Sequence, residues 1–138
     1  MKLRHLILSS LLAVCSSAFA EILVIVHPDN AIGNISKEDA NAYFLGKKGT
    51  FPDGSQVLVI DQDESSTVRE AFYNAVAGKN PSQMNAYWSN LIFTGKGQPP
   101  KAVFDDGEVL DLIRGNKNTI GYIDASAGTD GVKVISKI

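Results

Sequence analysis

The chain has 138 residues, with 13 Lys and Arg against 15 Asp and Glu, one cysteine and a formal net charge of −2. This length accommodates one domain with its own hydrophobic core. No basic cluster is longer than Lys47-Lys48, which argues against a nucleic-acid partner because binding to a phosphate backbone needs concentrated positive charge.

The N-terminus has the features of a secretory signal peptide. Two basic residues precede an apolar run over 6–14, and Ala18-Phe19-Ala20 fits the small-x-small cleavage site. We therefore predict a signal peptide over 1–20 and one domain over 21–138, located in the periplasm. The apolar run is too short for a permanent membrane span, and no second run approaches the roughly 20 residues required, so we expect no membrane-spanning segment.

Strands and helices are predicted to alternate in the first half of this domain. Glu21 to Val26 is a continuous apolar run, typical of a strand buried on both faces, and is expected at the centre of a sheet. Ser36 is expected to cap a short helix that ends at Gly46, with Asp39 in the capping-box position. Val57 to Ile60 is the second predicted strand.

A second helix is predicted directly after this strand. Thr67 and Glu70 are expected to form its capping box, and Gly78 is expected to end it. Apolar side chains recur between them with helical spacing: Val68, Ala71, Phe72, Ala75 and Val76.

A third helix is predicted from Asn80 and Pro81 to about Gly95. One stripe of this helix is apolar and is interpreted as core: Met84, Tyr87, Trp88, Leu91 and Ile92. No regular structure is expected over Lys96 to Lys101, because glycine and two prolines interrupt it.

Asp105 or Asp106 is predicted to cap a fourth helix that ends at Gly115, and strands are expected over 119–123 and 132–135. Gly121 within the first of these strands indicates a bulge or a close approach of backbone or ligand. The alternation predicts a three-layer α/β/α lobe with a mixed, mostly parallel sheet.

The polar segment between the second strand and its helix contains the candidate ligand-binding residues. A helix N-terminus leaves backbone N–H groups unpaired and carries partial positive charge, so Ser65, Ser66 and Thr67 could add hydroxyl donors for an anion. Ser and Thr are equally ordinary helix caps, and Asp61 and Asp63 would oppose an anion, so both interpretations stay open.

The sequence offers no catalytic constellation. His27 is the only histidine after residue 20, which excludes a two-histidine metal motif, and no serine lies in G-x-S-x-G. The segment from Asp61 to Phe72 begins like a calcium loop but lacks its central glycine and final glutamate. We therefore expect a protein that is not an enzyme, with no cofactor and no metal.

Five segments, taken in order, resemble the phosphate ABC transporter substrate-binding proteins: His27-Pro28-Asp29-Asn30, Phe44-Leu45-Gly46-Lys47, Ser65-Ser66-Thr67 with Arg69 and Phe72, the stretch 92–100, and Thr119-Ile120-Gly121-Tyr122. The resemblance implies the α/β lobe of a type II periplasmic binding protein, and the chain is long enough for about one lobe. It also implies a small anion such as phosphate as ligand and an ABC permease as partner.

In that family the phosphate loop has the form R-x-x-G-S-G-T, which falls on Asp61 to Thr67. The resemblance implies Ser65, Ser66 and Thr67 as ligand-binding residues, with Arg69 one turn later as the cation. Asp61 stands where the loop has its arginine and Glu64 where it has a glycine, so phosphate binding is expected to be weak and an arginine at position 61 to strengthen it.

The alternative function is a single-lobe interaction or regulatory module of the cell envelope. In that case, the lobe would no longer bind phosphate, and the surface around His27, Lys47 and Lys96 would dock on an envelope protein or a signalling receptor.

Overall fold

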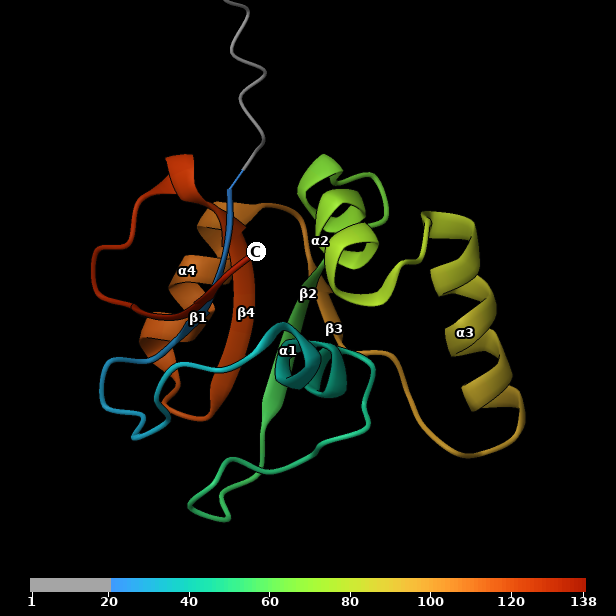
Figure 1. Cartoon of the computed structure of the whole chain (residues 1–138), viewed down its shortest axis with the longest axis horizontal. Coiled ribbons are helices and arrows are strands. Elements are labelled where there is room, and N and C mark those ends of the chain that lie inside the picture. The colour runs from blue at the N-terminus through green and yellow to red at the C-terminus, as the bar shows by residue number, and fades with distance from the viewer. Residues whose placement is uncertain (1–20) are drawn as a thin grey trace, which may run out of the picture.

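A computed structural model describes residues 21–138 (Figure 1). The predicted signal peptide lies outside the described residues, and its cleavage remains a prediction. The elements follow in the order β1 (Ile22–Val26), α1 (Lys37–Phe44), β2 (Leu58–Gln62), α2 (Thr67–Ala77), α3 (Pro81–Phe93), β3 (Lys101–Val103), α4 (Asp106–Gly115), β4 (Thr119–Asp124), the 3-10 turn η1 (Ala125–Ala127) and β5 (Lys133–Lys137).

The strands form one five-stranded sheet in the order β3-β2-β4-β1-β5. β2 pairs in parallel with both β3 and β4, whereas β1 is antiparallel to β4 and to β5. The mixed sheet predicted from the sequence is therefore confirmed, with β1 running against its four companions. β1 has a partner on both sides but lies next to the central position, which β4 occupies.

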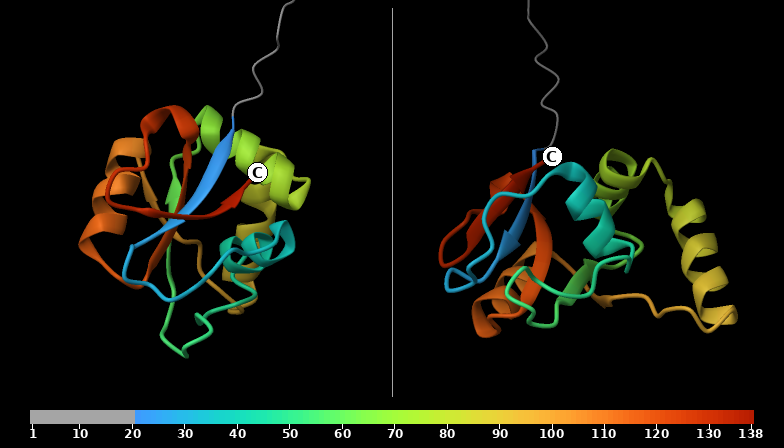
Figure 2. Two further views of the ribbon diagram at one scale, coloured as in Figure 1. Left: turned by 60° about the vertical axis from the view of Figure 1, so that its left-hand side comes forward. Right: turned by 60° about the horizontal axis from the view of Figure 1, so that its bottom comes forward.

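Two apolar clusters, one on each face of the sheet, make this a three-layer lobe (Figure 2). Side chains of β1 alternate between them: Ile22 and Val24 enter the cluster with α1, α2 and α3, and Leu23 and Ile25 enter the cluster with α4. This alternation explains why a strand buried on both faces is apolar throughout. The three-layer α/β/α architecture is thereby confirmed.

Helix α3 stands at the margin of the lobe, as the right-hand view in Figure 2 shows. Its Met84 and Trp88 are buried, and the Tyr87 hydroxyl donates to the Leu45 carbonyl at 2.6 Å. Ile92, predicted as core, is 52% exposed, because the last turn of α3 has passed the helices against which its first turns pack.

Strand β3 is the element that the sequence interpretation missed. Its three residues pair with Ile60, Asp61 and Gln62 of β2, which continues two residues beyond the predicted end at Ile60. A strand this short has no periodicity of its own and exists because β2 offers it a parallel edge. The added pairing carries Asp61 and Gln62 into the buried interior.

No helix among residues 21–138 is long and apolar enough to cross a membrane.

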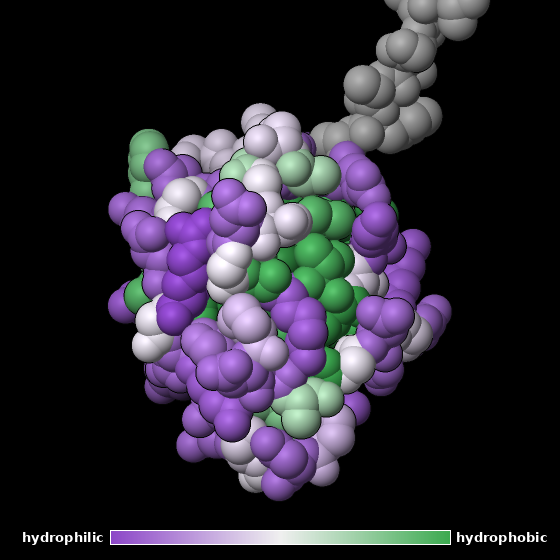
Figure 3. All heavy atoms as spheres, turned by 90° about the vertical axis from the view of Figure 1, so that its left-hand side faces the viewer, coloured by the Kyte–Doolittle hydropathy of each residue, from purple (hydrophilic) through white to green (hydrophobic). Residues whose placement is uncertain are grey.

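The side of the lobe that faces left in Figure 1 shows a strip of apolar residues between hydrophilic ones (Figure 3). Partly buried Leu112, Val132 and Val134 pack against the cluster that contains α4.

Gly121 marks a close approach between β4 and α4, one of the two predicted possibilities. A Cβ placed on Gly121 would lie 2.8 Å from Val109 Cγ1, which is closer than van der Waals contact permits. We expect Gly121→Ala to lower the free energy of unfolding by about 1 to 3 kcal/mol through overpacking, measured by urea denaturation.

Gly33→Ala is the control, because nothing lies within 4 Å of a Cβ at Gly33. In a protein that already carries Val109→Ala, Gly121→Ala should cost less stability than it does in the parent, because the clashing methyl group is gone. A Gly121→Ala protein as stable as the parent would contradict the close approach.

Candidate functional site

The candidate site lies at the carboxyl edge of the parallel strands β2 and β3. The chain leaves β2 into α2 on one face of the sheet and leaves β3 into α4 on the other. Adjacent parallel strands whose following helices lie on opposite faces form a crevice at their carboxyl ends, the usual ligand position in open α/β sheets. Both helix N-termini, each with partial positive charge, therefore border one hollow of about 290 Å³.

Ser66, and not Thr67, caps α2. The Ser66 hydroxyl accepts from the Arg69 backbone N–H at 3.1 Å, which places Thr67 at the first helical position. The predicted capping box of Thr67 and Glu70 is therefore wrong by one residue, because the turn that begins at Asp63 brings Ser66 into the cap position. The other predicted caps are confirmed, with Asp105 as the cap of α4.

Gln62 fills the crevice between the two helix starts. Its Nε2 donates to Asp106 Oδ1 at 2.7 Å, and its Oε1 accepts from the Ser66 hydroxyl at 2.7 Å. The buried amide thus links the cap of α2 to the first residue of α4. The sequence analysis did not assign Gln62 to the site; the available signal was its position between an apolar strand and a helix start, and only the structure shows that it is buried.

The three predicted hydroxyl donors are not equally free. Ser65 Oγ donates to Asp63 Oδ1 at 2.7 Å, and this hydrogen bond holds the pKa of that exposed carboxyl below its usual value. The Ser66 hydroxyl donates to Gln62 Oε1 and accepts from the Arg69 backbone N–H. Within residues 21–138, the Thr67 hydroxyl and the Thr67 and Val68 N–H groups have no hydrogen-bond partner. These groups are the donors that remain for a ligand.

Carboxylates surround these donors. Asp105 and Asp106 line the same hollow as Thr67, and burial raises the pKa of Asp106 above its usual value. A raised pKa means that Asp106 takes up its proton at higher pH than a free aspartate, so its repulsion of an anion weakens as pH falls. At neutral pH the positive helix ends and the carboxylates oppose one another.

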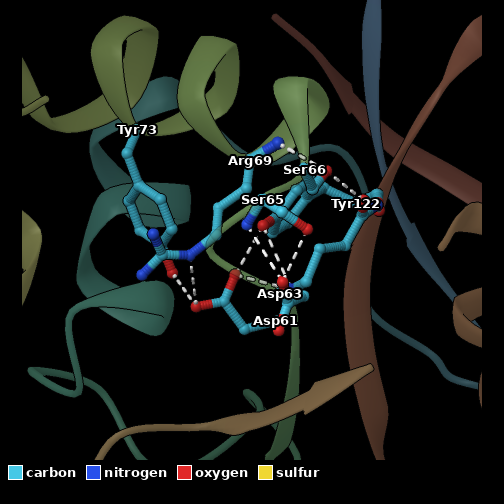
Figure 4. A network of polar contacts seen from close by, with 8 residues as sticks. Asp61, Asp63, Ser65, Ser66, Arg69, Tyr73 and Tyr122 are labelled. Atoms are coloured by element: carbon cyan, nitrogen blue, oxygen red, sulfur yellow. Dashed lines mark hydrogen bonds and ion pairs between the residues drawn. The ribbon is translucent and has the colours of Figure 1, made fainter. Parts of the chain in front are cut away.

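Asp61 lies beside this crevice in a buried polar network (Figure 4). Its Oδ1 accepts from the Tyr122 hydroxyl at 2.5 Å and from the Gln62 N–H at 2.8 Å. Its Oδ2 accepts from the Tyr73 hydroxyl at 2.9 Å and lies 3.6 Å from Arg69 Nε. One carboxylate thereby joins β2, α2 and β4.

Burial and the Asp61 carboxylate both raise the pKa of Tyr73 and of Tyr122 well above the ordinary value for tyrosine. Both hydroxyls therefore stay protonated and continue to donate to Asp61 at any ordinary pH. The Asp61 charge is compensated within the fold, in contrast to its predicted role as an obstacle at the ligand site.

Arg69 is directed away from the other predicted site residues. Its side chain is buried beside Asp61, its guanidinium carbon lies 5.2 Å from the centre of the Tyr73 ring, and it lines a second hollow next to α3. Ser65, Ser66 and Thr67 line the first hollow, so the fold does not bring Arg69 together with them. The ligand-binding role of all four residues stays a prediction.

No group of three or more His, Cys, Asp or Glu side chains in the described part of the chain could hold a metal ion.

No protein-family model and no curated protein matches the sequence.

Solved structures share the fold of this lobe. A phosphate-bound protein from Clostridium perfringens, assigned to phosphate ABC transporter substrate-binding proteins, superimposes with a TM-score of 0.64 at 23% identity over 85% of this chain and 45% of its own. An ABC-type phosphate transport receptor from Vibrio cholerae gives 0.65 at 16% identity, over 85% and 47%. PstS from Borrelia burgdorferi gives 0.56 at 19% identity, over 86% and 48%.

The chain thus has the fold of a lobe of phosphate-type substrate-binding proteins and spans less than half the length of these three structures. At such low identities the likeness establishes the fold and leaves the ligand open.

Proposed function

We propose that the protein is an exported, non-enzymatic solute-binding lobe that takes a small anion such as phosphate, weakly, at the N-terminus of α2. Thr67 supplies its hydroxyl and N–H, Val68 supplies its N–H, and Ser65 and Ser66 shape the loop. An ABC permease or another envelope protein is the proposed partner.

One observation carries this proposal: two helix N-termini meet at the carboxyl edge of β2 and β3, with unused donors at the start of α2. Unpaired backbone N–H groups at a helix start favour a negative charge by about 0.3 to 1 kcal/mol. Each nearby carboxylate opposes an anion by about 1 kcal/mol at 4 Å in bulk water. These opposed contributions support weak binding, with a dissociation constant in the high micromolar range or above.

Calorimetric titration with phosphate tests the proposal. We expect Asp105→Asn with Asp106→Asn to strengthen phosphate binding about tenfold, because two opposing charges leave the hollow. Asparagine caps a helix as well as aspartate and keeps an acceptor for Gln62, so α4 should remain intact.

The matched control is Asp53→Asn with Asp111→Asn, which removes two charges that do not line this hollow. An equal gain in the control would indicate a net-charge effect. Absence of phosphate binding in the parent and in the Asp105→Asn, Asp106→Asn protein would overturn the proposal and leave Ser65 to Thr67 as part of a helix cap only.

A second candidate is the envelope interaction module. Phe93 is 93% exposed at the end of α3, beside exposed Ile92 and close in sequence to Lys96. Adjacent exposed apolar side chains next to a charged residue are typical of a surface that binds another protein. The same titrations discriminate between the two functions, because this candidate requires no phosphate binding in any of the variants.

A further inference from the structure

A second cleft, separate from the hollow between the two helix starts, lies between the end of β2, helix α3 and the segment that leads into β3. Its volume is about 580 Å³, within the range of small-molecule sites. One wall is apolar and is formed by Trp88, Ile92, Pro99 and Pro100. The cleft lies where α3, which packs on the lobe mainly through Met84 and Trp88, diverges from the sheet, while Lys96 to Pro100 lead back to it (Figure 1).

Two of the residues that line this cleft have a buried N–H donor without an acceptor. Arg69 and Trp88 are each 6% exposed, and neither Arg69 Nε nor Trp88 Nε1 has a hydrogen-bond partner within residues 21–138. Asp61 Oδ2, at 3.6 Å, is too far from Arg69 Nε for a hydrogen bond. Buried donors in folded proteins are almost always paired, so two unpaired donors from α2 and α3 at one cleft indicate a missing acceptor.

Three of the residues that line the cleft carry carboxylates: the buried Asp61 and the exposed Asp63 and Glu64. Asp63 and Glu64, both exposed, follow the end of β2 and line the cleft beside Arg69. A ligand that carried only negative charge would gain the two donors but would face all three carboxylates. A ligand that also carried an ammonium group would interact favourably with them.

We propose that this cleft binds a small zwitterion with an apolar body, in the manner of a free amino acid such as leucine. The ligand carboxylate accepts from Arg69 Nε and Trp88 Nε1 after a small adjustment of these side chains, the ammonium group lies toward Asp63 and Glu64, and the apolar body lies against Ile92, Pro99 and Pro100. Ser65 to Thr67 and the free N–H groups of α2 do not line this cleft, so its ligand would lie apart from the phosphate site, although Gln62 lines both hollows.

The chain contains a single tryptophan, Trp88, so tryptophan emission comes from one residue, which lines this cleft. We expect L-leucine to change the emission saturably, with a dissociation constant below about 1 mM. Two analogues each remove one charge: 4-methylpentanoate lacks the ammonium group and 3-methylbutan-1-amine lacks the carboxylate. Each should bind at least tenfold more weakly than leucine.

Two variants, measured by calorimetry, locate the ligand. Trp88→Phe keeps an aromatic ring but removes the N–H, and should weaken leucine binding about tenfold, the range of a hydrogen bond to a charged group. Glu64→Gln should weaken it about threefold, whereas Glu70→Gln, in the first turn of α2 and outside the cleft, should not change it.

Three results would overturn the proposal: no saturable response to leucine, equal binding of the carboxylate-only analogue, or unchanged binding in Trp88→Phe. Competition by phosphate for leucine would show that the two sites are not independent. Failure of leucine binding together with retained phosphate binding would refute this cleft as a site and leave the proposed function intact.

Discussion

Replacement of Asp61 by alanine is expected to lower the free energy of unfolding by about 3 to 5 kcal/mol. The substitution removes the acceptor of two tyrosine hydroxyls and leaves the Arg69 guanidinium buried without its counter-charge. Breaking one side of a buried ion pair costs this much because the remaining charge stays out of water. Urea denaturation of the two proteins measures the difference.

A double replacement separates the charge from the packing. Asp61→Leu with Arg69→Met removes both members of the pair and should recover much of the loss, because an apolar pair of similar volume leaves no buried charge. Asp63→Ala, two residues away but exposed, should change stability by less than about 1 kcal/mol. A small loss in Asp61→Ala would mean that Arg69 reaches solvent when its partner is absent.

This network also changes the expectation for an arginine at position 61. Asp61 is buried among three donors and lies next to Arg69, so an arginine there would place two cations side by side in the interior. Like charges brought together out of water are strongly unfavourable. Charge removal at Asp105 and Asp106 is therefore the better test of phosphate binding.

Replacement of Trp88 by alanine is expected to lower the free energy of unfolding by about 3 to 5 kcal/mol, the range for a large aromatic side chain removed from a core. The indole lies against Gly46 at the end of α1, with Cη2 3.5 Å from where a Gly46 Cβ would lie, and its ring centre is 5.0 Å from that of Tyr87. The loss should appear in the midpoint of thermal or urea unfolding.

Phe93→Ala, on the same helix, is the control for this change. Phe93 is almost fully exposed, so its removal should alter stability by less than about 0.5 kcal/mol. If Trp88→Ala cost less than about 1 kcal/mol, the packing of α3 against α1 and α2 in the free protein would be wrong.

Local signals in the sequence were enough to predict most elements and their ends. The caps Ser36 and Asn80 and the C-terminal Gly78 are where the sequence placed them, because each acts through hydrogen bonds or a backbone angle within a few residues. Gly78 has φ +62°, the left-handed angle that favours glycine at this position. The apolar run of β1 was similarly sufficient to predict burial on both faces.

The arrangement at the candidate site was decided by tertiary structure. β3 forms only because β2 offers a parallel edge, and Asp61 is compensated by Tyr122, which lies 61 residues later in the chain. Helical geometry alone turns the side chains of Thr67 and Arg69, two residues apart, in different directions, but the packing of α3 and α4 decides which hollow each side chain lines. Sequence spacing determines contacts within a turn or a helix, whereas the partner of a buried charge depends on which distant strand folds against it.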